Sequence, residues 1–310
     1  METLDIVIPV FNEEECIEEL CFRLIQLRDK MKSTLNVRLL FVDDGSTDNT
    51  VSFIEKIAKK NKYFSLLKLS RNFGHQIAVS AGLDNSTSDF VAIIDADLQD
   101  PPELLSDMYE LLSSGYDVVY GKRKSRSGET LFKKLTAKYF YKILSNLCDI
   151  EIPRDTGDFR IMTKRIVDEL RNMREKHRFV RGMVPWIGFK SAPFIYDRHE
   201  RYAGETKYPI SKMISFAINA IFSFSKRPLV FATKIGLYSI FGALIMGFYI
   251  FYLKLFTDQV VEGLTIIILT IIFIGGLQIF ITGVIGEYIA RIFEEVKDRP
   301  LYVIDKKINL

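Results

Sequence analysis

The sequence predicts an α/β fold, a Rossmann-like, doubly wound sheet, followed by two membrane-spanning helices. Short apolar runs alternate with helical stretches through residues 1–120, which is the order of a parallel sheet covered by helices on both faces. Acidic segments follow two of these runs, at the end of the strands where such sheets bind ligands. Two long segments almost without charge occupy the last third of the chain.

Five runs are predicted to be strands because they are apolar throughout, as expected for strands buried on both faces. They are Asp5–Val10, Arg38–Val42, Ser65–Leu69, Phe90–Ile94 and Asp117–Tyr120. Helices are predicted at Glu13–Met31, Asp48–Lys60, Phe73–Asn85 and Pro102–Leu112. Proline favours the first helical turn, so Pro101-Pro102 marks the start of the last of these helices.

Two segments are long and apolar enough to cross a bilayer, for which about 20 apolar residues suffice. Leu229–Leu253 carries a single charge, Lys234, and Gly263–Gly286 carries none. Basic residues flank the pair on both outer sides, so the positive-inside rule predicts that both termini are cytosolic. The expected organisation is a cytosolic domain at 1–209, a juxtamembrane amphipathic helix at 210–228, two spans within 229–288 and a cytosolic tail at 289–310.

Two further segments have patterns that suit a membrane surface, so membrane lipids are expected partners. Lys122–Lys142 is basic and aromatic. It is either a solvated helix face or a segment that binds anionic headgroups or a phosphorylated lipid. Ile210–Phe224 has one apolar face and leads into the first span, as an interfacial helix does. Gly283 and Gly286 allow the second span to pack closely on the first span or on a second copy, which leaves a homo-oligomer open.

The totals exclude other classes of protein. A net charge of +3, from 42 basic and 39 acidic residues, is too small and too mixed to indicate a nucleic-acid-binding protein. Cys16, Cys21 and Cys148 are odd in number and lack paired spacing, so neither a disulfide framework nor a zinc site is predicted.

The strongest local signal is an apolar strand that ends in two carboxylates, Asp95 and Asp97. If the backbone stays extended, both side chains point to the same side of the sheet. Two hard oxygen ligands at the ligand-binding end of a parallel sheet suit Mg²⁺ or Mn²⁺ shared with a substrate diphosphate.

A second acidic pair, Asp43-Asp44, follows the second predicted strand. One interpretation is a turn and helix cap, in which Gly45 permits an unusual backbone angle. The other is a carboxylate that accepts a hydrogen bond from a nucleotide base or ribose. Phe11, just after the first strand, is expected beside the base pocket.

Six strings follow one another along the chain: Ile8-Pro9-Val10-Phe11-Asn12-Glu13, Val42-Asp43-Asp44-Gly45-Ser46, Ser70-Arg71-Asn72-Phe73-Gly74-His75, Asp95-Ala96-Asp97, Asp97-Leu98-Gln99-Asp100-Pro101-Pro102-Glu103 and Thr156-Gly157-Asp158-Phe159-Arg160. Together with the paired spans they resemble the family-two glycosyltransferases of GT-A fold. Within these the chain is similar to polyprenyl-phosphate hexosyltransferases, namely bactoprenol glucosyltransferases and dolichol-phosphate mannose synthases. The resemblance extends from about residue 4 to Tyr302, with Phe11 where the family usually has Tyr.

The resemblance implies a set of site residues. Those near the sugar nucleotide are Pro9, Phe11, Glu13, Val42, Asp44, Asp95, Ala96, Arg123, Arg201 and Lys207. The ligands of Mg²⁺ or Mn²⁺ are Asp95, Asp97 and Gln99, and the catalytic residues are Asp158 and Arg160. A phosphomonoester acceptor has a second pKa of about 6 and is already largely dianionic at neutral pH. Asp158 is therefore expected either to remove a residual proton or to orient the phosphate through Arg160.

The implied reaction is inverting transfer of one hexose, with glucose from UDP-glucose favoured, to undecaprenyl or a related polyprenyl phosphate. It would occur at the cytosolic face of the inner, or cytoplasmic, membrane. GDP-mannose, N-acetylglucosamine and aminopentose donors stay open, because no residue reads the base or the sugar hydroxyls decisively. A processive polysaccharide synthase is disfavoured because the single tryptophan, Trp186, is not in a Gln-x-x-Arg-Trp motif. The set Asp95, Asp97 and Asp158 disfavours a non-enzymatic scaffold or flippase component.

Overall fold

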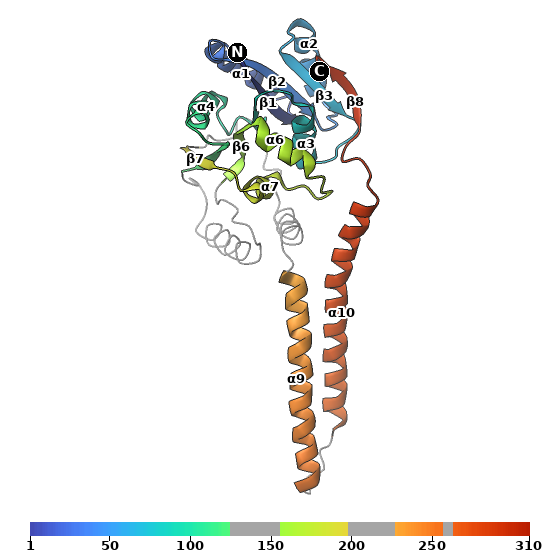
Figure 1. Cartoon of the computed structure of the whole chain (residues 1–310). Coiled ribbons are helices and arrows are strands. Elements are labelled where there is room, and N and C mark those ends of the chain that lie inside the picture. The colour runs from blue at the N-terminus through green and yellow to red at the C-terminus, as the bar shows by residue number, and fades with distance from the viewer. Residues whose placement is uncertain (125–155, 198–226, 257–262) are drawn as a thin grey trace. The chain divides into compact units, whose positions relative to one another are not determined.

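The computed structural model describes residues 1–124, 156–197, 227–256 and 263–310, which belong to two compact units (Figure 1). The first unit contains a mixed sheet with its helices and also the C-terminal residues Pro300–Leu310. The second contains the two long helices and ends at Arg299.

Eight described strands form one sheet in the order β7-β5-β6-β4-β1-β2-β3-β8. Their bounds are β1 Glu2–Val10, β2 Leu35–Asp43, β3 Phe64–Leu69, β4 Phe90–Ile93, β5 Val118–Arg123, β6 Thr156–Thr163, β7 Ser191–Tyr196 and β8 Ile304–Ile308. The helices of this unit are α1 Ile17–Met31, α2 Thr50–Lys60, α3 His75–Asn85, the 3-10 helix η1 Pro102–Leu104, α4 Leu105–Ser113, α6 Lys164–Asn172 and α7 Val180–Ile187.

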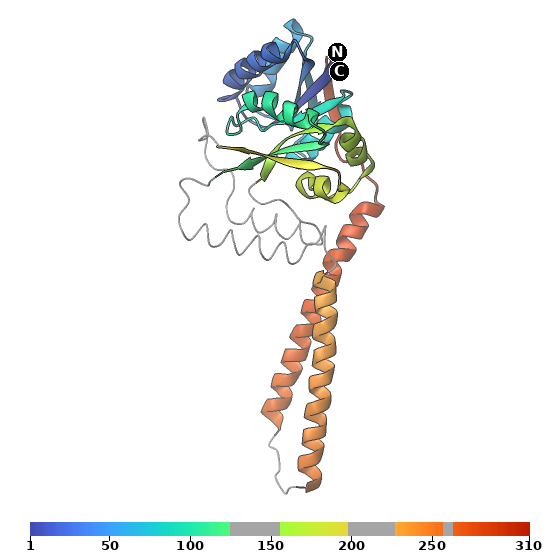
Figure 2. The same ribbon diagram turned by 60° about the vertical axis from the view of Figure 1, so that its left-hand side comes forward.

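All five predicted strands form, and they run in one direction. β1 pairs in parallel with β2 and β4, and β2 pairs in parallel with β3. β6 is antiparallel to both β4 and β5, so β5 keeps the direction of β4. The sheet is nevertheless mixed, because β6 is inserted between two parallel strands and β8 adds an antiparallel edge (Figure 2). β6, β7 and β8 were not predicted.

Helix α3 matters most for the site, because it carries His75 at its first position. It packs so closely on the sheet that a Cβ added at Gly82 would lie 2.2 Å from Cγ1 of Val7. Ala78, Val79 and Ala81 are likewise fully buried. Small residues therefore hold α3 tightly against β1, and His75 is placed by rigid packing.

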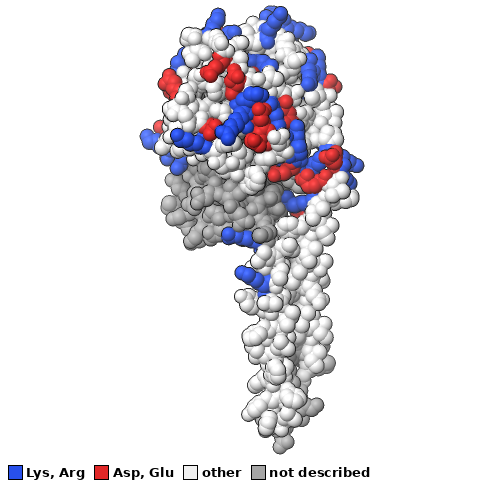
Figure 3. Space-filling model, viewed as in Figure 1, with Lys and Arg blue, Asp and Glu red and all other residues white. Residues whose placement is uncertain are grey.

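The second unit consists of α9 (Arg227–Phe256) and α10 (Leu264–Val296). Both contain a stretch that is long and apolar enough to cross a membrane by length and composition, Arg227–Leu253 and Phe273–Val296. In the view of Figure 3, Lys, Arg, Asp and Glu cover much of the sheet unit but are sparse along these helices. The predicted amphipathic segment Ile210–Phe224 lies outside the described residues, as does Lys122–Lys142 beyond Lys124.

Candidate active site

The carboxyl ends of β1 and β2 are linked by hydrogen bonds between the loops that follow them. The Asn12 amide N–H donates to Oγ of Ser46 at 3.0 Å, and the Thr47 N–H donates to Oδ1 of Asn12 at 2.8 Å. The Glu13 N–H donates to Oγ1 of Thr50 at 2.9 Å. The two loops predicted to contact the nucleotide therefore form one structure.

The predicted nucleotide-binding residues differ in exposure within these loops. Pro9 and Val42 are buried in the strand ends, whereas Phe11 is 37% exposed. Glu13 is partly exposed at the start of the loop into α1. Phe11 and Glu13 are thus the members of this group that present surface at the sheet edge.

The buried carboxylate of Asp44 accepts hydrogen bonds from two backbone amides. Its Oδ1 accepts a hydrogen bond from the Phe73 N–H at 2.7 Å, and its Oδ2 accepts one from the Gly74 N–H at 2.9 Å. The same turn needs glycine at position 45, where φ is +77° and an added Cβ would lie 2.6 Å from the Arg71 carbonyl carbon. Asp44 therefore fixes the loop that leads into α3, whereas α2, the helix that follows this turn, has no side-chain cap hydrogen bond.

The backbone after β4 is not extended, although the argument about Asp95 and Asp97 assumed that it was. β4 ends at Ile93, a turn begins at Ala96, and Leu98 has φ of +58°. The same-side argument for Asp95 and Asp97 was conditional on an extended backbone, so it does not apply here. The turn is instead closed by the Gln99 N–H, which donates to Oδ1 of Asp97 at 3.1 Å.

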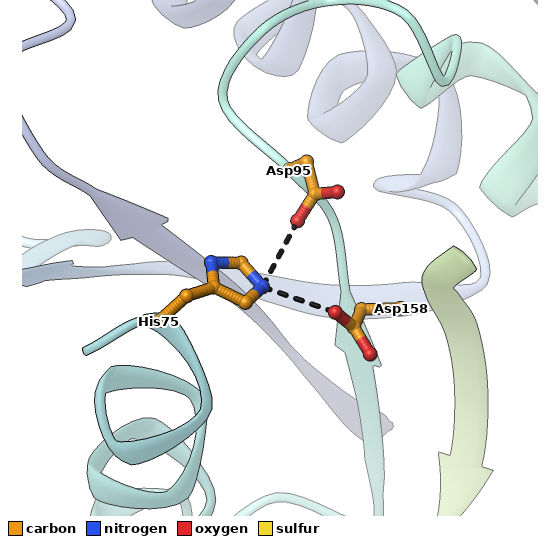
Figure 4. A group of neighbouring side chains, drawn as sticks. All are labelled: His75, Asp95 and Asp158. Atoms are coloured by element: carbon orange, nitrogen blue, oxygen red, sulfur yellow. Dashed lines mark hydrogen bonds and ion pairs between the residues drawn. The ribbon is translucent and has the colours of Figure 1, made fainter. Parts of the chain in front are cut away.

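Asp158 on β6 lies at the centre of a charged cluster and has no exposed surface. The Nε and Nη2 atoms of Arg181 donate to its Oδ1 and Oδ2 at 2.9 and 2.8 Å. His75 Nε2 and Gln76 Nε2 each lie 3.1 Å from Oδ2. His75 Nε2 is also 3.4 Å from Oδ1 of Asp95, so the imidazole bridges the two carboxylates (Figure 4).

The mutual charges set the protonation of this cluster. Burial alone would lower the pKa of His75, but the hydrogen bond to Asp158 and the charge of Asp95 raise it to about 9. Burial alone would raise the pKa of Asp158, but the charge of Arg181 and the bond from His75 hold that pKa well below its ordinary range. Burial raises the pKa of Asp95 to about 6. At neutral pH the centre therefore contains imidazolium, guanidinium and carboxylates.

Arg160 does not face the open side of this cluster. Its side chain is 4% exposed, and it donates to the backbone carbonyls of Asp158 at 3.2 Å and Gly157 at 3.0 Å. Burial lowers the pKa of Arg160 to about 10. Arg160 thus binds the backbone carbonyls of β6 next to Asp158.

Arg123 lies on the other side of Gly157. An added Cβ at Gly157 would be 2.9 Å from Nη2 of Arg123. That guanidinium is 3.8 Å from Oδ1 of Asp100, a fully buried carboxylate that also accepts a hydrogen bond from the Tyr196 hydroxyl. Arg123, unlike Arg160, is partly exposed, with 21% of its side chain accessible. The remaining predicted basic residues, Arg201 and Lys207, lie outside the described residues.

A divalent cation fits the β4 end of the site. Oδ1 of Asp95 is buried and accepts no hydrogen bond from the described residues; its charged neighbour is His75 Nε2 at 3.4 Å, and such an oxygen can also take a cation. His75, Asp95 and Asp158 place three possible ligand atoms within 4.8 Å of one another. His75 and Asp158 are poor ligands, however, because the imidazole is protonated and Asp158 is occupied by Arg181. Asp97 and Gln99, which were predicted as ligands together with Asp95, follow it in the same turn and would add oxygen ligands.

Three residues of the cluster were missed as site residues: His75, Gln76 and Arg181. His75 occurs in one of the strings that carried the resemblance, but no role was given to it. Gln76 and Arg181 lie in α3 and α7, where neither spacing nor composition distinguishes them from ordinary helix residues. Only the fold brings them to Asp158.

Comparisons with known proteins show the family of this chain. The family model of glycosyl transferase family 2 matches residues 5–171, which include β1 to β6. This chain belongs to glycosyl transferase family 2. The transferase is 46% identical to YkcC, an uncharacterized glycosyltransferase of Bacillus subtilis (strain 168), over 98% of this chain and 94% of that protein.

A second relative carries a more specific name. The transferase is 36% identical to the bactoprenol glucosyl transferase of Shigella phage SfII, over 98% of this chain and 97% of that protein. Among solved structures, mannosyl-3-phosphoglycerate synthase from Rubrobacter xylanophilus is similar with a TM-score of 0.50 and 15% identity, covering 71% of this chain and 72% of that one. This structural likeness bears on the fold alone, which is GT-A-like.

Proposed function

We propose that this transferase moves one hexose, with inversion, from a nucleoside diphosphate sugar to a polyprenyl phosphate. UDP-glucose is the favoured donor and undecaprenyl phosphate the favoured acceptor. The full-length similarity to a bactoprenol glucosyl transferase supports this choice. The observation that carries it is the pair of partly exposed cations, Arg181 and His75, that cover the buried Asp158 beside carboxylates that suit a metal. Such a site favours an acceptor that is itself an anion.

The chemistry needs little base catalysis. A phosphate oxygen of the acceptor attacks the anomeric carbon, and the bond from that carbon to the diphosphate oxygen breaks. The nucleoside diphosphate leaves with the electron pair, so negative charge grows on it. A bound Mg²⁺ or Mn²⁺ would stabilise this charge. Asp95, Asp97 and Gln99 would hold the cation, and Arg123 would add a positive charge nearby.

The reaction would take place at the cytosolic face of the cytoplasmic membrane. Two helices long and apolar enough to cross a membrane support an attachment that keeps a lipid acceptor within reach. We propose a catalytic domain at 1–209, an interfacial helix at 210–228, two spans within 229–288 and a cytosolic segment at 289–310, whose residues Pro300–Leu310 belong to the sheet unit.

The deciding experiment is a donor panel. Detergent-purified protein is incubated with labelled UDP-glucose, UDP-N-acetylglucosamine, a UDP-aminopentose and GDP-mannose, each with undecaprenyl phosphate, and the lipid product is identified by mass spectrometry. We expect a single glucosyl phospholipid. A product made only from GDP-mannose would show that GDP-mannose, and not UDP-glucose, is the donor. The absence of a lipid product with every donor would overturn the proposed reaction.

The metal dependence is tested separately. Excess EDTA should abolish transfer, and Mg²⁺ or Mn²⁺ should restore it. Asp97→Ala should lower kcat/KM by at least about 100-fold, because the diphosphate charge is poorly neutralised with one carboxylate fewer. Asp107→Ala, on the outer helix α4, is the matched control and should keep wild-type activity. Full turnover in excess EDTA would contradict the metal role.

A further inference from the structure

A fully buried carboxylate of the site, Asp158, is joined directly to two partly exposed cations, Arg181 and His75. Asp158 has no exposed surface, and its two oxygens receive Arg181, His75 and Gln76. An acceptor cannot touch this carboxylate without displacing at least one of them. Arg181, by contrast, has 29% of its side chain exposed. His75 is 38% exposed, so both cations present surface to a ligand, but only the Arg181 guanidinium offers a planar fork of N–H donors.

Arg181 is held in place from both ends. It is the second residue of α7, whose first residue, Val180, donates its N–H to Oε1 of Gln76 at 3.0 Å. Gln76 in turn donates from Nε2 to Asp158 at 3.1 Å. One glutamine thus ties the start of α7 to the same carboxylate that binds the Arg181 side chain. This arrangement orients the guanidinium before any ligand arrives.

We propose that Arg181 binds the phosphate of the acceptor and that Asp158 is a positioning residue for Arg181. The proposal rests on the proposed function, since it assigns a contact to the acceptor of that reaction. A guanidinium has five N–H donors in a rigid plane, so it can bind a carboxylate on one edge and a phosphate on another. Arg160 is not suited to this role because its donors reach backbone carbonyls inside the protein.

The arrangement also selects the chemical class of acceptor. The Asp158 carboxylate faces inward and is covered by donors, so the described part of the site presents cations to the nucleophile at this position. A phosphate monoester gains charge-assisted hydrogen bonds from Arg181. A polyprenol hydroxyl gains much less and also needs a base. Arg181 therefore favours polyprenyl phosphate over the corresponding alcohol.

The experiment compares Arg181→Gln and Arg181→Lys with the wild-type transferase. Initial rates with undecaprenyl phosphate give the acceptor KM, and calorimetry gives the donor Kd. We expect Arg181→Gln to raise the acceptor KM by about 10- to 100-fold, as for loss of a charge-assisted hydrogen bond, with donor Kd unchanged within twofold. Arg181→Lys should recover part of the loss. Arg165→Gln, an exposed arginine stacked on Phe189, is the control and should resemble wild type.

A double variant separates acceptor binding from mere charge balance around Asp158. Arg181→Gln with Asp158→Asn leaves no buried carboxylate without its arginine. If Arg181 contacts the acceptor, the KM stays raised in the double variant. If Arg181 only neutralises Asp158, the KM of the double variant returns to near the wild-type value, and the inference is overturned. The double variant also serves if Arg181→Gln alone does not fold.

Different results would reject the role of Arg181 and the proposed function. An acceptor KM unchanged in Arg181→Gln, with wild-type protein making the lipid product, rejects Arg181 alone. Absence of lipid product from the wild-type protein rejects the reaction itself. Farnesol and farnesyl phosphate provide a second test, as binding probes that differ only in the phosphate. The ratio of their affinities should be smaller for Arg181→Gln than for the wild type.

Discussion

At the residue scale, the position of Asp158 decides what it can do. A carboxylate with a pKa held well below its ordinary range and no exposed surface is a weak base and cannot reach a substrate directly. The same carboxylate is well placed to orient His75 and Arg181. Of the two roles left open by the sequence, positioning is therefore the better supported, with Arg181 in the place first given to Arg160.

The pH dependence of Asp158→Asn tests this role. Because the lowered pKa keeps Asp158 ionised throughout the range from about pH 6 to 8, its charge does not change there. We expect transfer to fall at least about 10-fold, by nearly the same factor at each pH, with a raised acceptor KM. Initial rates across this range provide the measurement. A loss that shrinks as the acceptor ionises above about pH 6 would instead identify Asp158 as a base.

At the element scale, β8 fastens the C-terminus to the sheet. It pairs antiparallel with β3, from Leu66 opposite Ile308 to Leu69 opposite Ile304. Just before it, the Tyr302 hydroxyl lies 3.1 Å from Oδ2 of Asp84 at the end of α3. The chain that leaves α10 is thus tied to the helix whose other end carries His75.

Tyr302→Phe tests the strength of this attachment. Removal of the hydroxyl leaves the largely buried Asp84 with one donor fewer, which should destabilise the sheet unit by about 1–3 kcal/mol. Lys306→Ala, which breaks an exposed ion pair with Glu55, should cost less than about 1 kcal/mol. Unfolding followed by the fluorescence of Trp186 on α7 gives both values. Equal stabilities of the two variants would contradict the role of Tyr302.

At the scale of the whole molecule, the sheet restricts the membrane topology. β1 begins at Glu2 and β8 ends at Ile308, and both belong to one sheet. A hydrogen-bonded sheet of this kind cannot be divided across a bilayer, so both ends must lie on one side. An even number of spans, two, satisfies this condition, and the basic flanks favour the cytosol.

The predicted topology is tested by protease protection of epitope tags at each end. In sealed inside-out vesicles, whose cytosolic face is outward, both tags should be cleaved. In intact spheroplasts both should be protected. Protection of only one tag in either preparation would be incompatible with two spans that return the chain to the sheet.

The sequence predicted strands that form continuous apolar runs, and it missed strands in which charged residues interrupt that pattern. Apolar runs without alternation predicted all five parallel strands within a few residues, because burial on both faces leaves a continuous apolar segment. β6 was missed because Asp158 and Arg160 interrupt its apolar pattern, and both are buried only because they pair inside the fold. β8 carries Asp305, Lys306 and Lys307, charges that suit an exposed edge strand but hide it from hydropathy.

The sequence by itself determined the class of enzyme, the α/β fold and the two apolar helices, since motif order, apolar runs and span length are all written along the chain. The tertiary structure alone decided how the charges of the site are paired. His75, Asp158 and Arg181 come from α3, β6 and α7, and their contacts exist only after these elements pack together. Burial and pairing set their pKa values and their access to a ligand, and neither property can be read from the spacing of residues in a chain.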